Sequence, residues 1–144
     1  MLNLLSALAS VATAVAVIVA AWQLVLSKRQ AMTAFEDSLA KEYRDLAAKI
    51  PVKALLGDPL SEAECAQHFD ELYHYFDLCN EQIFLVRSGR ISRKTWAFWQ
   101  DGIASNMARP AFSRAWSEIA ARAGGDFSEL RDLFPPDPFD PPVA

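Results

Sequence analysis

The sequence predicts an all-α protein, in which one N-terminal transmembrane helix continues into a cytoplasmic stalk and is followed by a bundle of about four short helices. Three observations support this fold class. Residues 4–26 contain no charged side chain. Beyond them, apolar residues recur at intervals of three and four, the period of an amphipathic helix. No stretch of useful length alternates as a β-strand would. The 144 residues suffice for one modest domain.

Residues 1–27 are expected to form a transmembrane anchor. The first charged side chain is Lys28, and residues 4–26 would form a helix roughly 34 Å long, against about 30 Å for a bilayer core. A cleaved signal peptide is the alternative, but it would have a basic start and a shorter apolar stretch. The sequence therefore favours an anchor that is retained.

The charges that flank the anchor predict its orientation. Lys28 and Arg29 follow it directly, and no charged residue precedes it. By the positive-inside rule, the N-terminus lies outside and residues 28 onward lie in the cytoplasm. Trp22 fits an interfacial position near the cytoplasmic end. A reducing cytoplasm also suits a chain with only two cysteines, which cannot build a disulfide framework.

Small residues form two rows along the anchor at four-residue spacing. Such rows let helices approach closely in lipid, so they favour self-association; alternatively, alanine is simply common in this anchor. The rows are Ser6, Ser10 and Ala14, and Ala12, Ala16 and Ala20.

Residues 28–50 are expected to form an amphipathic stalk helix that Pro51 ends. Its apolar stripe packs either on the rest of the chain or, as a parallel coiled coil, on a second protomer. The stripe consists of Met32, Phe35, Leu39, Tyr43, Leu46 and Ile50.

After a predicted loop at residues 51–60, residues 61–134 are expected to form the cytoplasmic helical domain. Ser61 and Glu64 have the spacing of a capping box, which predicts a helix from there to about Arg87, before Gly89. Ser92 caps a third helix, Pro110 begins a fourth and Gly124-Gly125 ends it. A short last helix starts near Asp126 or Ser128. Residues 135–144 form a Pro-rich tail that cannot continue a helix.

Both cysteines and both histidines lie between Cys65 and Cys79, as in a zinc site. On one continuous helix, however, His74 points away from Cys65, and Cys79 lies about 21 Å along the axis. Four ligands cannot then meet at one metal ion. We therefore assign no metal ligand, although Cys65 and His68 could form half of an intermolecular site.

No catalytic or cofactor-binding residue is assigned either, and we expect the protein not to be an enzyme. Cys79 lies on the apolar stripe, and neither His68 nor His74 is placed to activate it as a nucleophile. No phosphate-binding loop, nucleophile elbow or metalloprotease motif is present. The net charge of −4 provides no basic field for nucleic acid, so no nucleic-acid partner is expected.

Two groups of residues remain candidates for binding. Cations at a turn between helices could contact an anion or a lipid headgroup, or pair instead with Asp77, Glu81 and Asp101. Large aromatic side chains on the two following helices could form the core or a partner surface. The cations are Arg87, Arg90, Arg93 and Lys94, and the aromatic residues are Trp96, Trp99, Phe112 and Trp116.

Residues 75–119 also carry a set of residues that resembles an uncharacterised group of small bacterial membrane proteins. The resembling positions are Tyr75-Phe76, Leu78-Cys79-Asn80-Glu81, Gly89-Arg90-Ile91, Trp96, Trp99, Gly102 and Pro110–Trp116. The resemblance implies one N-terminal span, a helical cytoplasmic domain and a bacterial inner membrane. It is to a domain of unknown function, so it implies no catalytic residue.

Together these features predict a membrane-anchored helical adaptor or accessory subunit that binds a protein partner at the cytoplasmic face of the inner membrane. Its expected partners are the lipid bilayer and a protein or a second copy of the chain, with no cofactor. A homo-oligomeric membrane effector or pore component is the first alternative. A hydrolase or nuclease using the histidine, cysteine and carboxylate side chains is the second.

Overall fold

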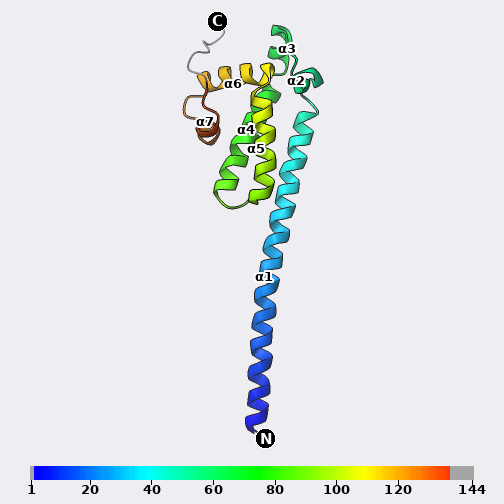
Figure 1. Ribbon diagram of the computed structural model, residues 1–144, viewed down its shortest axis with the longest axis vertical. Coiled ribbons are helices and arrows are strands. Elements are labelled where there is room, and N and C mark those ends of the chain that lie inside the picture. Colours follow the sequence, from blue (N-terminus) through cyan, green and yellow to red (C-terminus); the bar gives the residue numbers. More distant parts are fainter. Residues whose placement is uncertain (1, 137–144) are drawn as a thin grey trace. The chain divides into compact units, whose positions relative to one another are not determined.

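A computed structural model describes residues 2–136 of the chain, and part of the predicted tail, residues 137–144, lies outside them. Within the described residues all regular structure is helical and no strand occurs, which confirms the predicted fold class (Figure 1). The helices are α1 Leu2–Ala47, α2 Val52–Leu56, α3 Glu62–Gln67, α4 Phe69–Arg87, α5 Arg93–Met107, α6 Pro110–Arg122 and α7 Ser128–Leu133.

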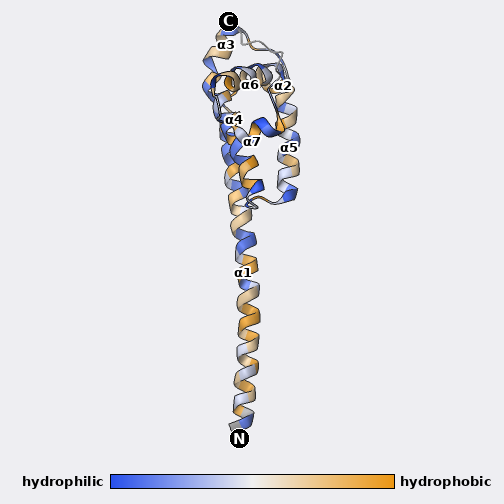
Figure 2. Cartoon of the chain, turned by 90° about the vertical axis from the view of Figure 1, so that its left-hand side faces the viewer, coloured by the Kyte–Doolittle hydropathy of each residue, from blue (hydrophilic) through white to orange (hydrophobic). Residues whose placement is uncertain are grey.

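The chain divides into two compact units, Met1–Phe35 and Glu36–Ala144. The first contains the apolar part of α1, which is orange over most of its length in Figure 2, and by length and composition α1 is able to cross a membrane. Two hydroxyl groups in it bond within the helix: Ser10 Oγ donates to Ser6 O and Thr13 Oγ1 to Ala9 O, each at 2.9 Å. The helix therefore satisfies these polar groups itself, as a lipid environment requires.

The second unit is built around α4, which packs against α6 and α7, while α5 packs against α6. Its centre is a set of buried aromatic rings. Phe76 of α4 meets Phe112 and Trp116 of α6 edge-on or tilted, with ring centroids 6.5 and 5.3 Å apart. Such contacts add to the free energy of burying the rings. This core holds the helices of residues 36–136 together.

The predicted helix ends are confirmed where local chemistry decides them. Ser61 and Glu64 form the complete capping box, and the Ser92 side chain accepts the Thr95 N–H. Pro110 occupies the first turn of α6. Gly89 has φ +69°, a left-handed conformation that glycine adopts without strain and that closes α4.

The structure corrects two expectations. The segment 51–60 is not entirely loop, because Val52–Leu56 form one helical turn that ends at Gly57 in the left-handed conformation. Cys65 to Cys79 do not lie on one helix either, since the chain turns at His68, with φ −109° and ψ 16°.

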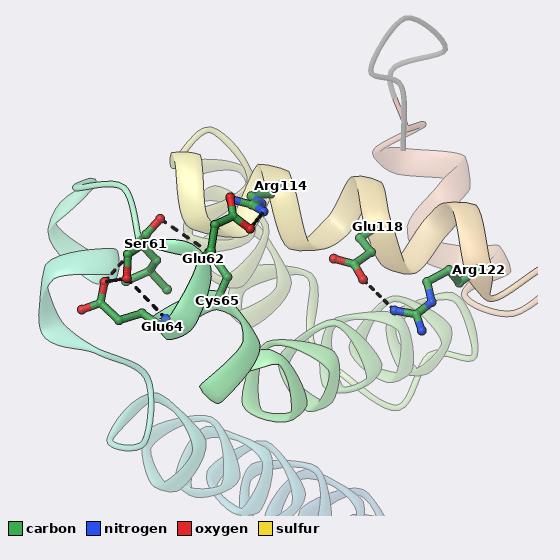
Figure 3. Close-up of polar contacts among 8 residues, drawn as sticks. Ser61, Glu62, Glu64, Cys65, Arg114, Glu118 and Arg122 are labelled. Carbon is green, nitrogen blue, oxygen red and sulfur yellow. Dashed lines mark hydrogen bonds and ion pairs between the residues drawn. The ribbon is translucent and has the colours of Figure 1, made fainter. Parts of the chain in front are cut away.

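Contacts on both sides of α3 explain the turn at His68. Glu62 accepts a hydrogen bond from Arg114 of α6 at 2.6 Å (Figure 3). Glu64 accepts one from Lys53 of α2 at 2.7 Å. These pairs hold α3 in a direction that differs from α4. Tertiary contacts thus override a local sequence that contains no helix breaker.

The second half of the predicted stalk stripe packs on its own domain. Leu39 and Ile50 are buried, and the ring of Tyr43 lies 6.4 Å from that of Tyr75 in α4. For these positions the structure favours packing on the same chain over a coiled coil between protomers. The helix itself ends at Ala47, slightly before Pro51.

Candidate functional site

A cavity of about 570 Å³ lies between the last turns of α1, α4 and α5. It is mostly apolar, and its wall combines residues from three separate parts of the second unit. They are Ala40, Tyr43 and Arg44 of α1, Tyr75, Cys79 and Gln82 of α4, and Phe98, Trp99, Asp101, Gly102, Ile103 and Asn106 of α5. Its volume lies within the range of about 300–1,000 Å³ that small-molecule sites occupy.

One group of polar side chains in the wall is internally satisfied. Asn106 is buried, and its Nδ2 donates to the Tyr75 hydroxyl at 2.9 Å. Its Oδ1 accepts a hydrogen bond from Arg109 Nη1. Burial raises the pKa of Tyr75 well above its ordinary value, so the phenol is neutral. These groups therefore stabilise the wall without needing a ligand.

Gln82 is different, because its side chain has no such partner. The residue is only 5% exposed, and it lines the cavity. Among residues 2–136, no hydrogen bond joins its amide to another group. A primary amide offers two donors and two acceptor lone pairs. Among the described residues, the buried side-chain atoms without a partner are His68 Nδ1 and Glu71 Oε2, so solvent reaches the Gln82 amide, which is free to bond to a molecule in the cavity.

Gly102 widens the cavity from the α5 side. It lies in the helix interior, where glycine costs about 0.5–1 kcal/mol relative to alanine. A Cβ atom built on it would meet nothing within 4 Å. No close approach of another segment therefore explains this glycine, and the wall is open at this position.

The rim of the cavity carries exposed aromatic and charged side chains. Phe98 is 78% exposed, although it is a large apolar residue on a helix. Tyr43 and Trp99 contribute further rings, and Arg44 and Asp101 contribute opposite charges. The rim thus presents an apolar surface with balanced charge.

A carboxylate network fixes α5 against α1 beside this cavity. Glu36 accepts the Ser92 N–H at 2.6 Å through Oε1 and the Thr95 hydroxyl at 2.7 Å through Oε2. The Ser92 hydroxyl in turn donates to Thr95 Oγ1 at 2.9 Å. Burial alone would raise the pKa of Glu36, but the hydrogen bonds from Ser92 and Thr95 outweigh it and lower the pKa.

The residues considered for metal binding or nucleophilic catalysis do not assemble. Among the described residues, no group of three His, Cys, Asp or Glu side chains could hold a metal ion. Cys79 is buried in the core, and burial raises the pKa of its thiol to about 12, so it is protonated at neutral pH. His74 is exposed, and His68 Nδ1 faces Glu71 Oε2 at 3.9 Å.

In the basic turn, one cation is paired with carboxylates and the other three are exposed. Arg87 pairs with Glu129 and Asp132 of α7, not with the three carboxylates considered from the sequence. Arg90, Arg93 and Lys94 are exposed, and over residues 2–136 they form no ion pair. The N-terminus of α5 is already occupied by the Ser92 hydroxyl and the Glu36 carboxylate.

The aromatic candidates lie partly in the core and partly at the cavity. Phe112 and Trp116 are buried in the core, and Trp116 Nε1 donates to Phe134 O at 3.1 Å. Trp96 packs partly against the same core. Trp99 lines the cavity, so it alone of this set lies at the candidate site.

Sequence reasoning missed the other cavity residues, although two of them carried a signal. Gln82 and Asn106 each follow an apolar stripe residue, Cys79 and Ile103, by three positions. Each therefore places a polar side chain on a buried helix face. In comparisons with protein families, curated proteins and solved structures, no match to this chain is found.

Proposed function

We propose that this protein is a membrane-anchored helical adaptor or accessory subunit, whose domain binds a protein partner at the cytoplasmic face of a bacterial inner membrane. The observation that carries the proposal is the exposed Phe98 beside an aromatic-lined cavity. Burying a phenylalanine side chain contributes about 1.5–3 kcal/mol. Aromatic anchors next to pockets are the positions where protein interfaces concentrate their binding energy.

The proposed location rests on the sequence and on the first unit. The apolar part of α1 is long enough to cross a membrane. Lys28 and Arg29 directly after it support a cytoplasmic domain by the positive-inside rule. A bacterial inner membrane is proposed on the sequence resemblance of residues 75–119 alone, since no family, curated protein or solved structure matches the chain.

A binding role is favoured over an enzymatic one by the state of the reactive groups. The buried Cys79 thiol is protonated, and neither histidine lies next to it in the cavity wall. A protonated thiol without a base is a poor nucleophile. The carboxylates near the cavity are engaged, as Glu36 is, or stand at its rim, as Asp101 does.

Anionic lipid headgroups are proposed as ligands of the unpaired cations Arg90, Arg93 and Lys94. Each basic residue near an anionic surface contributes about 1 kcal/mol. A bimane label on Ser88→Cys, in a Cys65→Ser background, should be quenched by spin-labelled lipid more strongly in anionic than in zwitterionic nanodiscs. Exchanging the three cations for glutamine should remove that difference; equal quenching in both lipids would contradict this contact.

Self-association is the second candidate, because two rows of small residues run along α1. The structure supports close helix packing more than a pore. Ser10 and Thr13 direct their hydroxyls to their own backbone, which leaves them less able to line a polar channel. A second copy of the chain would then be the partner, with small-residue rows at the helix interface.

Photo-cross-linking in native membranes tests the adaptor proposal. Phe98 is replaced with p-benzoylphenylalanine, and the matched control carries the same group at Ala121, which is exposed on α6. The expected result is one protein adduct of defined mass at position 98 and none at 121. An adduct of twice the chain mass would instead support self-association. Absence of any protein adduct at position 98 would refute the adaptor proposal.

A further inference from the structure

We propose that the cavity between α1, α4 and α5 binds a small, flat, neutral molecule that carries a hydrogen-bond donor and an acceptor side by side, as a lactam or carboxamide does. This inference goes beyond the adaptor role and rests on the cavity wall alone. Three features of that wall support it: the unpaired amide of Gln82, the open space at Gly102 and the aromatic sides.

Gln82 defines the polar part of the ligand. The residue is buried and lines the cavity, and its amide, which solvent reaches, has no hydrogen-bond partner among residues 2–136. A primary amide is satisfied best by a group that donates to its oxygen and accepts from its nitrogen. A cis-lactam does both at once and forms two hydrogen bonds. Asn106 already donates to the Tyr75 hydroxyl, so these two side chains do not require a polar group on the ligand.

The wall also defines the apolar part. Tyr43 and Trp99 contribute aromatic rings, and Gly102, which is exposed, has open space beside it. Flat ring systems bury much area against such rings. A volume of about 570 Å³ accommodates a bicyclic molecule with room to spare.

The charges favour a neutral ligand. Arg44 and Asp101 carry opposite charges at the rim, and the thiol of Cys79 is neutral. Among the described residues, the only other ionisable side chains that line the cavity are the phenols of Tyr43 and Tyr75. A ligand with a net charge would lose hydration without gaining a matched partner.

The test uses 2-quinolinone as the probe, a flat bicyclic lactam, with the full chain in lipid nanodiscs. Saturation-transfer NMR measures binding, and empty nanodiscs correct for partition into lipid. We expect saturable binding with a Kd of about 1 mM or below, the range for a ligand of this size. Quinoline, which lacks the N–H and carbonyl pair, should bind at least about tenfold more weakly.

Three variants locate the probe. Gln82→Leu keeps the apolar wall and removes the amide, so affinity should fall about tenfold or more. Gly102→Leu fills the open space and should abolish binding while the α-helical circular dichroism remains. Ala104→Leu is the matched control, because it lies exposed on the same helix outside the cavity wall, and it should bind as the wild type does.

Two results would overturn the proposal: no saturable binding beyond empty nanodiscs, or equal affinity in wild type, Gln82→Leu and Gly102→Leu. If Gly102→Leu fails to fold, Gln82→Leu and the quinoline comparison still decide. The adaptor proposal is tested independently through the adduct at Phe98. An intact adduct without probe binding therefore refutes only the small-molecule site.

Discussion

Removing the Glu36 carboxylate should loosen α5 from α1. Glu36 accepts two short hydrogen bonds, from the Ser92 N–H at 2.6 Å and the Thr95 hydroxyl at 2.7 Å. Each hydrogen bond to a charged group contributes about 1.5–3 kcal/mol when buried. Because Glu36 is only half-buried, we reduce the total for both bonds to about 2 kcal/mol. Glu36→Ala should lower the free energy of unfolding by that amount.

The assay is urea unfolding of the full chain in nanodiscs, followed by tryptophan fluorescence and by hydrogen exchange of the first α5 amides. Glu36→Gln keeps one acceptor oxygen and should lose about half as much stability. Asp37→Asn is the matched control. It removes the same charge from the neighbouring exposed position, and it should change stability by less than about 0.5 kcal/mol.

Thr95→Val isolates one bond of the network. A double-mutant cycle with Glu36→Gln should give a coupling free energy of about 0.5–1.5 kcal/mol. Since the pKa of Glu36 is lowered on folding, its contribution should be complete above pH about 4.5 and decline as pH falls through the folded pKa. If Glu36→Ala and Asp37→Asn destabilise the chain equally, the carboxylate does not hold α5.

Three further predictions concern the core, the cavity wall and the capping box. Phe76→Ala should lower the free energy of unfolding, measured in urea, by about 3–5 kcal/mol, because the ring is fully buried among other aromatic rings. A loss below about 1 kcal/mol would contradict this packing. Asn106→Ala should cost about 1–3 kcal/mol in the same assay, since it leaves the buried Tyr75 hydroxyl without its donor. The Lys53 ammonium, followed by the Ser61 N–H, lowers the pKa of Glu64 to about 2. Its stabilisation should therefore be complete above pH about 4.5 and lost as pH falls toward 2, and thermal unfolding of Glu64→Gln should lack this dependence.

The sequence predicted the features that depend on neighbouring residues. Ser61 with Glu64 acts over three positions, so their spacing indicated that cap, and Ser92 was predicted as a cap from its place before the third helix. The apolar period of α4 likewise placed Cys79 in the core and His74 in solvent. The physical reason is that side chains three or four apart share one face of a helix.

Features that depend on distant residues were not predictable in this way. The turn at His68 follows from the pairs of Glu62 with Arg114 and of Glu64 with Lys53. The local sequence contains no helix-breaking residue that would predict this turn. The attachment of Glu36 to Ser92 also joins residues far apart in the chain, so the sequence could not show that a carboxylate already occupies the start of α5.

Two residues in the cavity wall are less favourable for stability than their positions in the fold would allow. Elsewhere in residues 36–136, α3 and α5 carry side-chain caps and the helices share an aromatic core. At the cavity the chain retains a helix-interior glycine, Gly102, and an amide without a hydrogen-bond partner among residues 2–136, that of Gln82. Gly102→Ala alone would add about 0.5–1 kcal/mol of stability. Natural proteins give up stability mainly where a binding or catalytic site requires it. The coincidence of both departures in one wall therefore favours this cavity over the basic turn as the place where the domain recognises its ligand.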